Sequence, residues 1–83
     1  MAISLLAEVF DSEGNKIDES FFGSLQPVRS WAKDQGATFI KTYDVNQEEE
    51  KYYLKAGAQG RWNETTEKMF NFIVNRNKEE SEG

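Results

Sequence analysis

The sequence contains no cysteine and no histidine among its 83 residues. Without cysteine, a disulfide framework and a metal site built from thiolates are excluded. Without histidine, the chain lacks the side chain that most often serves as a general base or a metal ligand near neutral pH. We therefore expect a protein that is not an enzyme, with no catalytic residues, no metal site and no cofactor.

Long apolar segments are also absent from the sequence. No stretch approaches the roughly 18 apolar residues that a membrane-spanning helix requires. Residues 1–6 lack both the basic start and the apolar run of a secretory signal peptide. We expect a cytoplasmic protein that does not interact with a membrane.

Aromatic residues are plentiful by contrast, at 13% of the chain. A chain of this length forms one domain, and a domain this small has little surplus stability. Each buried aromatic ring removes roughly 150–250 Å² from water, so the rings can supply a core without disulfides. We expect a single compact domain over residues 1–78, followed by an acidic disordered tail over residues 79–83.

The net charge of −5 is distributed unevenly along the chain. Residues 1–50 carry four basic and ten acidic side chains, whereas residues 51–78 carry six basic and two acidic ones. Such asymmetry is informative about partners. The acidic regions, at residues 8–19, residues 44–50 and the tail, either only solubilise the chain or cover a basic site on a partner.

The first part of the chain is typical of a β-hairpin. Apolar residues occupy alternate positions from Ile3 to Val9, as in a half-buried strand. We predict this strand over residues 2–11. Residues 11–15 are rich in side chains that favour turns, and a short return strand at residues 16–18 would complete the hairpin.

A helix is predicted after this hairpin. Apolar residues recur at helical spacing from Leu25 to Ala32, which places a helix over residues 24–35. Ser24 is suited to cap its start, and Gly36 is suited to end it.

A second hairpin follows, with predicted strands over residues 37–45 and 50–56. Both segments are rich in residues that favour strands. The loop of residues 46–49 predicts a register in which Tyr43 faces Tyr52. One face of this hairpin is mostly apolar and is assigned to the core. The other face is amphipathic, carries Lys51, Tyr53 and Lys55, and is expected to point away from the core.

The last predicted element is a helix that starts at Asn63, after a loop at residues 57–60. Its apolar stripe includes Met69, while Phe72 lies off that stripe. Phe72 either extends the core or offers a hydrophobic edge to a partner, so a homo-oligomer formed through this C-terminal helix is a further candidate.

The order of these elements predicts an α+β fold. The simplest packing is a small antiparallel sheet of three to four strands, in the order β-hairpin, α, β-hairpin, α, with both helices packed on one face.

Basic and aromatic side chains interleave between residues 51 and 62. This pattern suits single-stranded nucleic acid, because cations contact phosphates and rings stack on bases. The alternative is a tyrosine-rich strand packed in the core that leaves only its lysines exposed. The predicted site for nucleic acid or another partner comprises Lys51, Tyr53, Lys55, Arg61 and Trp62, with Arg29 and Lys33 added from the first helix.

No motif of a catalytic, phosphate-binding or calcium-binding site is present. In size, acidity and lack of a catalytic signature, the chain resembles small accessory proteins of phages and mobile elements, which include inhibitors of host defence systems and of toxins. This resemblance implies an inhibitor or regulator that acts stoichiometrically on a host protein or an RNA–protein complex. The alternative is a module that binds RNA or single-stranded DNA through residues 51–62.

Overall fold

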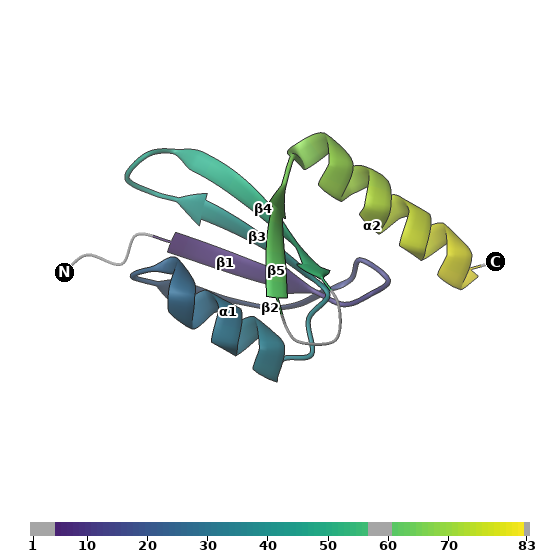
Figure 1. Ribbon diagram of the computed structural model, residues 1–83, viewed down its shortest axis with the longest axis horizontal. Coiled ribbons are helices and arrows are strands. Elements are labelled where there is room, and N and C mark those ends of the chain that lie inside the picture. Colours follow the sequence, from purple (N-terminus) through teal and green to yellow (C-terminus); the bar gives the residue numbers. More distant parts are fainter. Residues whose placement is uncertain (1–4, 57–60, 83) are drawn as a thin grey trace.

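The computed structural model describes residues 5–56 and 61–82, which form one antiparallel sheet and two helices (Figure 1). The order of strands in the sheet is β2-β1-β3-β4-β5. The α+β class is therefore confirmed, but the sheet has five strands instead of three to four. The elements in chain order are β1 (Leu5–Phe10), β2 (Lys16–Phe22), α1 (Leu25–Asp34), β3 (Phe39–Asp44), β4 (Glu49–Ala56), β5 (Arg61–Thr65) and α2 (Glu67–Glu82).

The hairpin of β1 and β2 is closed by the predicted turn. One side-chain oxygen of Asp11 accepts hydrogen bonds from the N–H groups of Glu13 and Asn15, both at 2.9 Å. Such side-chain bonds to the nearby backbone stabilise a tight turn. The return strand is longer than the predicted residues 16–18, because β2 pairs with β1 along its length with one bulge.

The hairpin of β3 and β4 forms as predicted, but its register differs. Tyr43 pairs with Glu50 and Lys41 pairs with Tyr52, so the predicted pairing of Tyr43 with Tyr52 is wrong by two residues. The cause lies in the turn, where the Asp44 carboxylate accepts hydrogen bonds from two backbone N–H groups at 2.9 and 3.1 Å. These bonds start the turn one residue earlier than predicted. A shift of two residues still leaves each side chain on the same face of the sheet.

Residues 61–65 form a fifth strand where a loop and the start of a helix were predicted. Asn63 lies inside this strand, so the prediction that it caps the last helix is wrong. The cap is Thr66, whose hydroxyl accepts a hydrogen bond from the N–H of Met69 at 3.2 Å. Pairing with β4 therefore overrides the local preference for a helix in this segment. The loop predicted at residues 57–60 lies outside the described residues.

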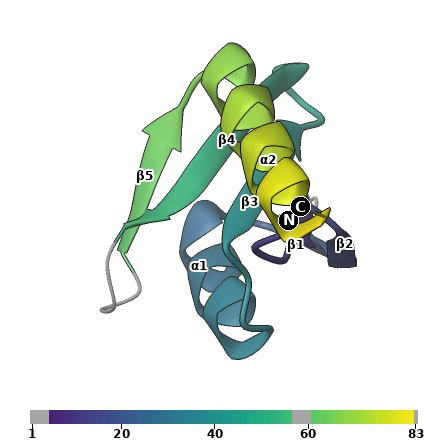
Figure 2. The same ribbon diagram turned by 90° about the vertical axis from the view of Figure 1, so that its right-hand side faces the viewer.

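The two helices pack on opposite faces of the sheet, so the prediction that they share one face is wrong. Successive residues of a strand point to opposite faces. Ile40 and Tyr53 are buried in the core on the α1 side, whereas Phe39 and Tyr52 are buried in the core on the α2 side. The two views show the strands between the helices (Figures 1 and 2).

Helix α1 confirms the helix predicted over residues 24–35. Its inward-facing residues are fully buried against the sheet. Gly36 follows the helix with a φ angle of 71°, a left-handed conformation that glycine adopts readily, and ends it as predicted. Ser24 occupies the N-cap position, but its side chain makes no capping hydrogen bond.

Helix α2 crosses the other face of the sheet and then extends past its end (Figure 1). It continues to Glu82, into the segment that was expected to form a disordered acidic tail. Phe70 anchors the helix to the sheet, with ring centroids 5.7 Å from Phe39 and 5.0 Å from Tyr52. Within the described residues, neither helix has the length and apolar character needed to cross a membrane.

Candidate binding site

Some basic side chains of the described residues are neutralised by neighbouring acids. Lys16 forms ion pairs with Glu8 and Glu19, and Lys41 forms one with Glu50 at 3.1 Å. On α2, Arg76 pairs with Glu80 one helical turn away, at 3.5 Å. These cations therefore have their electrostatic partners within the protein itself.

The remaining basic side chains form no ion pair with any residue in the described part of the chain. Two of them, Lys68 and Lys78, lie on α2, and both are exposed. The other five lie on α1, β4 and β5, and all five are exposed. We call these five side chains the basic face: Arg29, Lys33, Lys51, Lys55 and Arg61. The first four lie on α1 or on the face of β4 that α1 covers, whereas Arg61 lies on the edge strand β5, where the register directs it to the other side of the sheet from Lys55.

The Tyr53 phenol lies within electrostatic reach of one cation of α1 and one of β4. Burial is the main reason why the pKa of Tyr53 lies above its ordinary value, and Glu64 raises this pKa further. Lys51 and Arg29 lower it, because both cations favour the phenolate. A residue of β4 and a residue of α1 therefore act on the same hydroxyl, with one carboxylate of β5 nearby.

A hollow of about 350 Å³ lies between α1 and β5. It is lined by Arg29 from the helix and by Arg61, Trp62 and Asn63 from the strand. The Trp62 ring packs partly buried against the core on the α1 side. Its indole N–H is buried and has no acceptor among the described residues. Such an unsatisfied donor costs about 1–3 kcal/mol and calls for an explanation.

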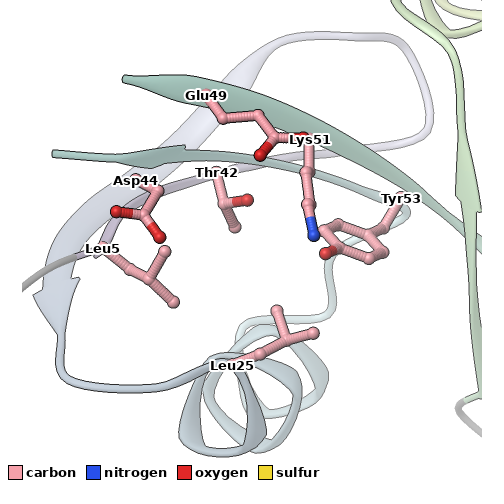
Figure 3. Close-up of a pocket in the computed structure, with 7 residues that line it drawn as sticks. All are labelled: Leu5, Leu25, Thr42, Asp44, Glu49, Lys51 and Tyr53. Carbon is pink, nitrogen blue, oxygen red and sulfur yellow. The ribbon is translucent and has the colours of Figure 1, made fainter. Parts of the chain in front are cut away.

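A second hollow, of about 190 Å³, lies between the sheet and the first turn of α1 (Figure 3). Figure 3 shows the Lys51 amine directed toward the Tyr53 hydroxyl, with Thr42 and Asp44 facing the same space. Leu5, Leu25 and Glu49 form the rest of the wall. This mixture of charges contains no nucleophile held by a base, which is the arrangement that covalent catalysis needs.

The predicted site residues of β4 lie on one strand face, but their exposure to solvent differs from the prediction. Lys51, Tyr53 and Lys55 share a strand face as predicted, yet this face is covered by α1, and Tyr53 is only 4% exposed. The expectation that this face points away from the core is therefore wrong. Its lysines remain exposed, whereas its tyrosine ring does not reach the surface.

Two residues beside the basic face, Asn63 and Glu64, were not predicted as part of a site. Both were assigned to the start of a helix, where their side chains would lie elsewhere. The pair Thr65 and Thr66 was the available signal, because β-branched residues favour a strand and threonine often caps a helix. Reading that pair as the end of a strand would have placed Asn63 and Glu64 next to β4.

Large apolar side chains are exposed at a separate surface, on the outer side of α2. Phe72 is 60% exposed and Met69 is 49% exposed. They are three residues apart and line one shallow hollow together with Thr66 and Lys68. Self-association through this helix stays a prediction.

Acidic side chains do not form a metal cage in the part of the chain that the structure describes, residues 5–56 and 61–82. Comparison with models of protein families, with curated proteins and with solved structures finds no match to this chain.

Proposed function

We propose that this chain is a non-catalytic binding protein that acts stoichiometrically on a protein partner through its basic face. The observation that carries this proposal is the separation of its cations. On the α2 side of the sheet, Lys16, Lys41 and Arg76 are paired with acids, while Lys68 and Lys78 are not. None of the five exposed cations on α1, β4 and β5 forms an ion pair with a described residue. An unpaired, exposed group of like charge is available to a partner of opposite charge.

The charge of the whole chain sharpens this contrast. The basic face uses half of the ten lysines and arginines of a chain that carries fifteen acidic side chains in all. An approaching acidic surface is attracted to the basic face and repelled by the rest of the molecule. Such a field orients the encounter and raises the association rate, an effect that salt weakens.

Single-stranded nucleic acid is the second candidate, because the same cations would contact phosphates. Binding of unpaired bases draws much of its free energy from stacking on exposed rings. In the stretch 51–62, however, Tyr52 is 6% exposed and Tyr53 is 4% exposed, and Trp62 packs against the core. The described rings of this stretch therefore offer little stacking surface, and this favours an acidic protein surface.

The proposed activity is inhibition or regulation by occupancy. A small protein that binds a site on a host protein or nucleoprotein blocks that site without chemistry. In size and acidity the chain resembles small accessory proteins of phages and mobile elements. These include inhibitors of host defence systems and of toxins, which act in this way.

Charge reversal on the basic face tests the proposal. In the variant Lys55→Glu/Arg61→Glu, the field toward the partner is inverted at two exposed positions of β4 and β5. The control Lys68→Glu/Lys78→Glu makes the same change of net charge on α2. We expect nuclease-treated lysate to yield one defined protein with the wild type and with the control, and none with the first variant.

Two results would count against a protein partner. Equal capture by the basic-face variant would show that the basic face is not the contact surface. Capture of nucleic acid alone, seen as excess absorbance at 260 nm that nuclease and high salt remove, would replace the protein by the second candidate. Unfolding curves of both variants show whether either change acts by loss of the fold.

A further inference from the structure

The hollow between α1 and β5 has two arginines in its lining. Three other hollows along the described residues have none. The two arginines, Arg29 of α1 and Arg61 of β5, are among the four residues that line the hollow between α1 and β5. Neither forms an ion pair with a residue in the described ranges. A guanidinium presents several donors in a fixed planar fork that matches a carboxylate or a phosphate.

The wall of this hollow also contains an unused donor. The buried indole N–H of Trp62 has no acceptor among the described residues. Native structures rarely leave a buried donor without a partner. Because this nitrogen is shielded from solvent, an oxygen of a group in the hollow would reach it only after a shift of the ring. Asn63, the remaining lining residue, adds an amide to the same wall.

From these observations, and on the basis of the function proposed above, we infer that this hollow seats a carboxylate from an acidic segment of the protein partner. Arg29 and Arg61 hold the carboxylate from two sides, and the Trp62 indole forms the wall behind it. The rest of the basic face contributes the general field that brings the segment to the hollow.

A carboxylate fits this position better than the phosphate backbone of a nucleic acid. A nucleic acid carries its charge along an extended strand and would continue onto the acidic remainder of the surface. A short acidic peptide segment can lie entirely within the basic face, so its charges do not extend over the acidic remainder of the surface. Glu64 raises the pKa of the neighbouring Tyr53, and its charge opposes any anion that binds on this side of β5.

Arginine-to-lysine exchange separates this hollow from the general field. The variant Arg29→Lys/Arg61→Lys keeps both charges and removes both forks. The probe is an N-acetylated hexaglutamate peptide, added to the ¹⁵N-labelled full chain. The indole signal of Trp62, assigned with Trp62→Phe, reports on the hollow. The indole signal of Trp31 serves as an internal reference, because Trp31 does not line this hollow. Its ring packs against Phe22, with ring centroids 5.1 Å apart.

We expect the peptide to shift the Trp62 signal in a saturable manner and to leave the Trp31 signal nearly unchanged. The double lysine variant should weaken binding by about tenfold or more, because bidentate contacts are lost. Glu64→Gln should strengthen binding, since it removes the opposing charge. Lys68→Gln, on α2, should leave binding unchanged.

Equal binding by the double lysine variant would overturn the inference, because the positive charge of the basic face would then be enough to bind the peptide without the guanidinium groups. A Trp62 shift produced by an oligothymidine strand and not by the peptide would overturn it as well. Neither result alone removes the proposed function, which fails when Lys55→Glu/Arg61→Glu leaves capture of the partner unchanged. The two sets of variants therefore distinguish failure of the inferred carboxylate site from failure of the proposed contact surface.

Discussion

Tyr52 links the sheet to the start of α2 through one hydrogen bond. Its hydroxyl donates to a carboxylate oxygen of Glu67 at 2.8 Å, across the core on the α2 side. Burial of the ring is the main cause that raises the pKa of this phenol, and the bond to Glu67 and the charge of Glu50 raise it further. All three effects favour the protonated form in the folded state.

This shift predicts a loss of stability in alkali. Below pH 10, the ordinary pKa of the phenol, Tyr52 is protonated in both states and its contribution to the folded state is complete. Above that pH, unfolded chains release the proton and the folded chain retains it, so the free energy of unfolding falls as pH rises. Urea unfolding at pH 8 and pH 11 measures this fall, which Tyr52→Phe should reduce.

Some fall should remain in Tyr52→Phe, because burial also raises the pKa of Tyr53. An identical fall in the variant and the wild type would show that Tyr52 is not the group responsible. At neutral pH the variant also loses a hydrogen bond to a charged group, which is worth roughly 1.5–3 kcal/mol in favourable cases.

At the scale of the element, the start of α2 distinguishes the observed cap from the predicted one. Thr66→Ala removes the oxygen that accepts the N–H of Met69, and should destabilise the protein by about 0.5–2 kcal/mol. Asn63→Ala should change the free energy of unfolding by much less, because Asn63 is exposed in β5. Thermal or urea unfolding of the two variants provides the comparison.

Thr66→Ser is the matched control for this cap, because serine keeps the hydroxyl oxygen and should preserve most of the stability. A larger loss for Asn63→Ala than for Thr66→Ala would restore the helix start that the sequence predicted and would contradict the observed β5.

The turn between β1 and β2 makes a tight contact with α2 at Gly14. This residue has a φ angle of 85°, and a Cβ atom at its position would lie 2.4 Å from Cγ1 of Val74. Gly14→Ala combines a left-handed conformation with this clash, so we expect a loss of about 1–3 kcal/mol in urea unfolding.

Two further variants separate the causes of that loss. Gly23→Ala should be nearly neutral, because a Cβ atom there meets no atom within 4 Å. Adding Val74→Ala to Gly14→Ala removes the clash and leaves the backbone strain, so the two changes should be less than additive. Full additivity would show that the turn and α2 do not touch.

Local signals were sufficient for α1 and for both hairpins. Spacing of apolar residues and the turn at Asp11 depend only on neighbours in the sequence, and these elements form as predicted. The register of the second hairpin was harder to obtain. It depends on whether the Asp44 side chain bonds to the turn backbone, and this displaces the turn by one residue.

At the scale of the whole molecule, the sequence contained a signal for two covered faces that was not used. Phe39 and Ile40 are adjacent and both buried, and so are Tyr52 and Tyr53. Adjacent strand residues face opposite sides, so two such pairs require a cover on each side of the sheet. Periodicity within one strand does not say which helix supplies which cover, because that choice depends on packing between distant segments.

The same packing explains which part of the candidate site was predictable. Lysine and arginine remain at the surface almost regardless of the fold, so the five cations of the basic face could be named from the sequence. Tyrosine is buried or exposed according to its neighbours, and α1 covers Tyr53. The hollow between α1 and β5 was not predictable, because β5 itself was taken for a loop and a helix start.

Amide hydrogen exchange of the full chain, alone and bound to the partner that it captures, tests most directly whether the basic face is the contact surface. Binding through this face should slow exchange in α1 and β5 and leave α2 unchanged. Slower exchange confined to α2 or to the β2 edge of the sheet, with α1 and β5 unaffected, would contradict the account.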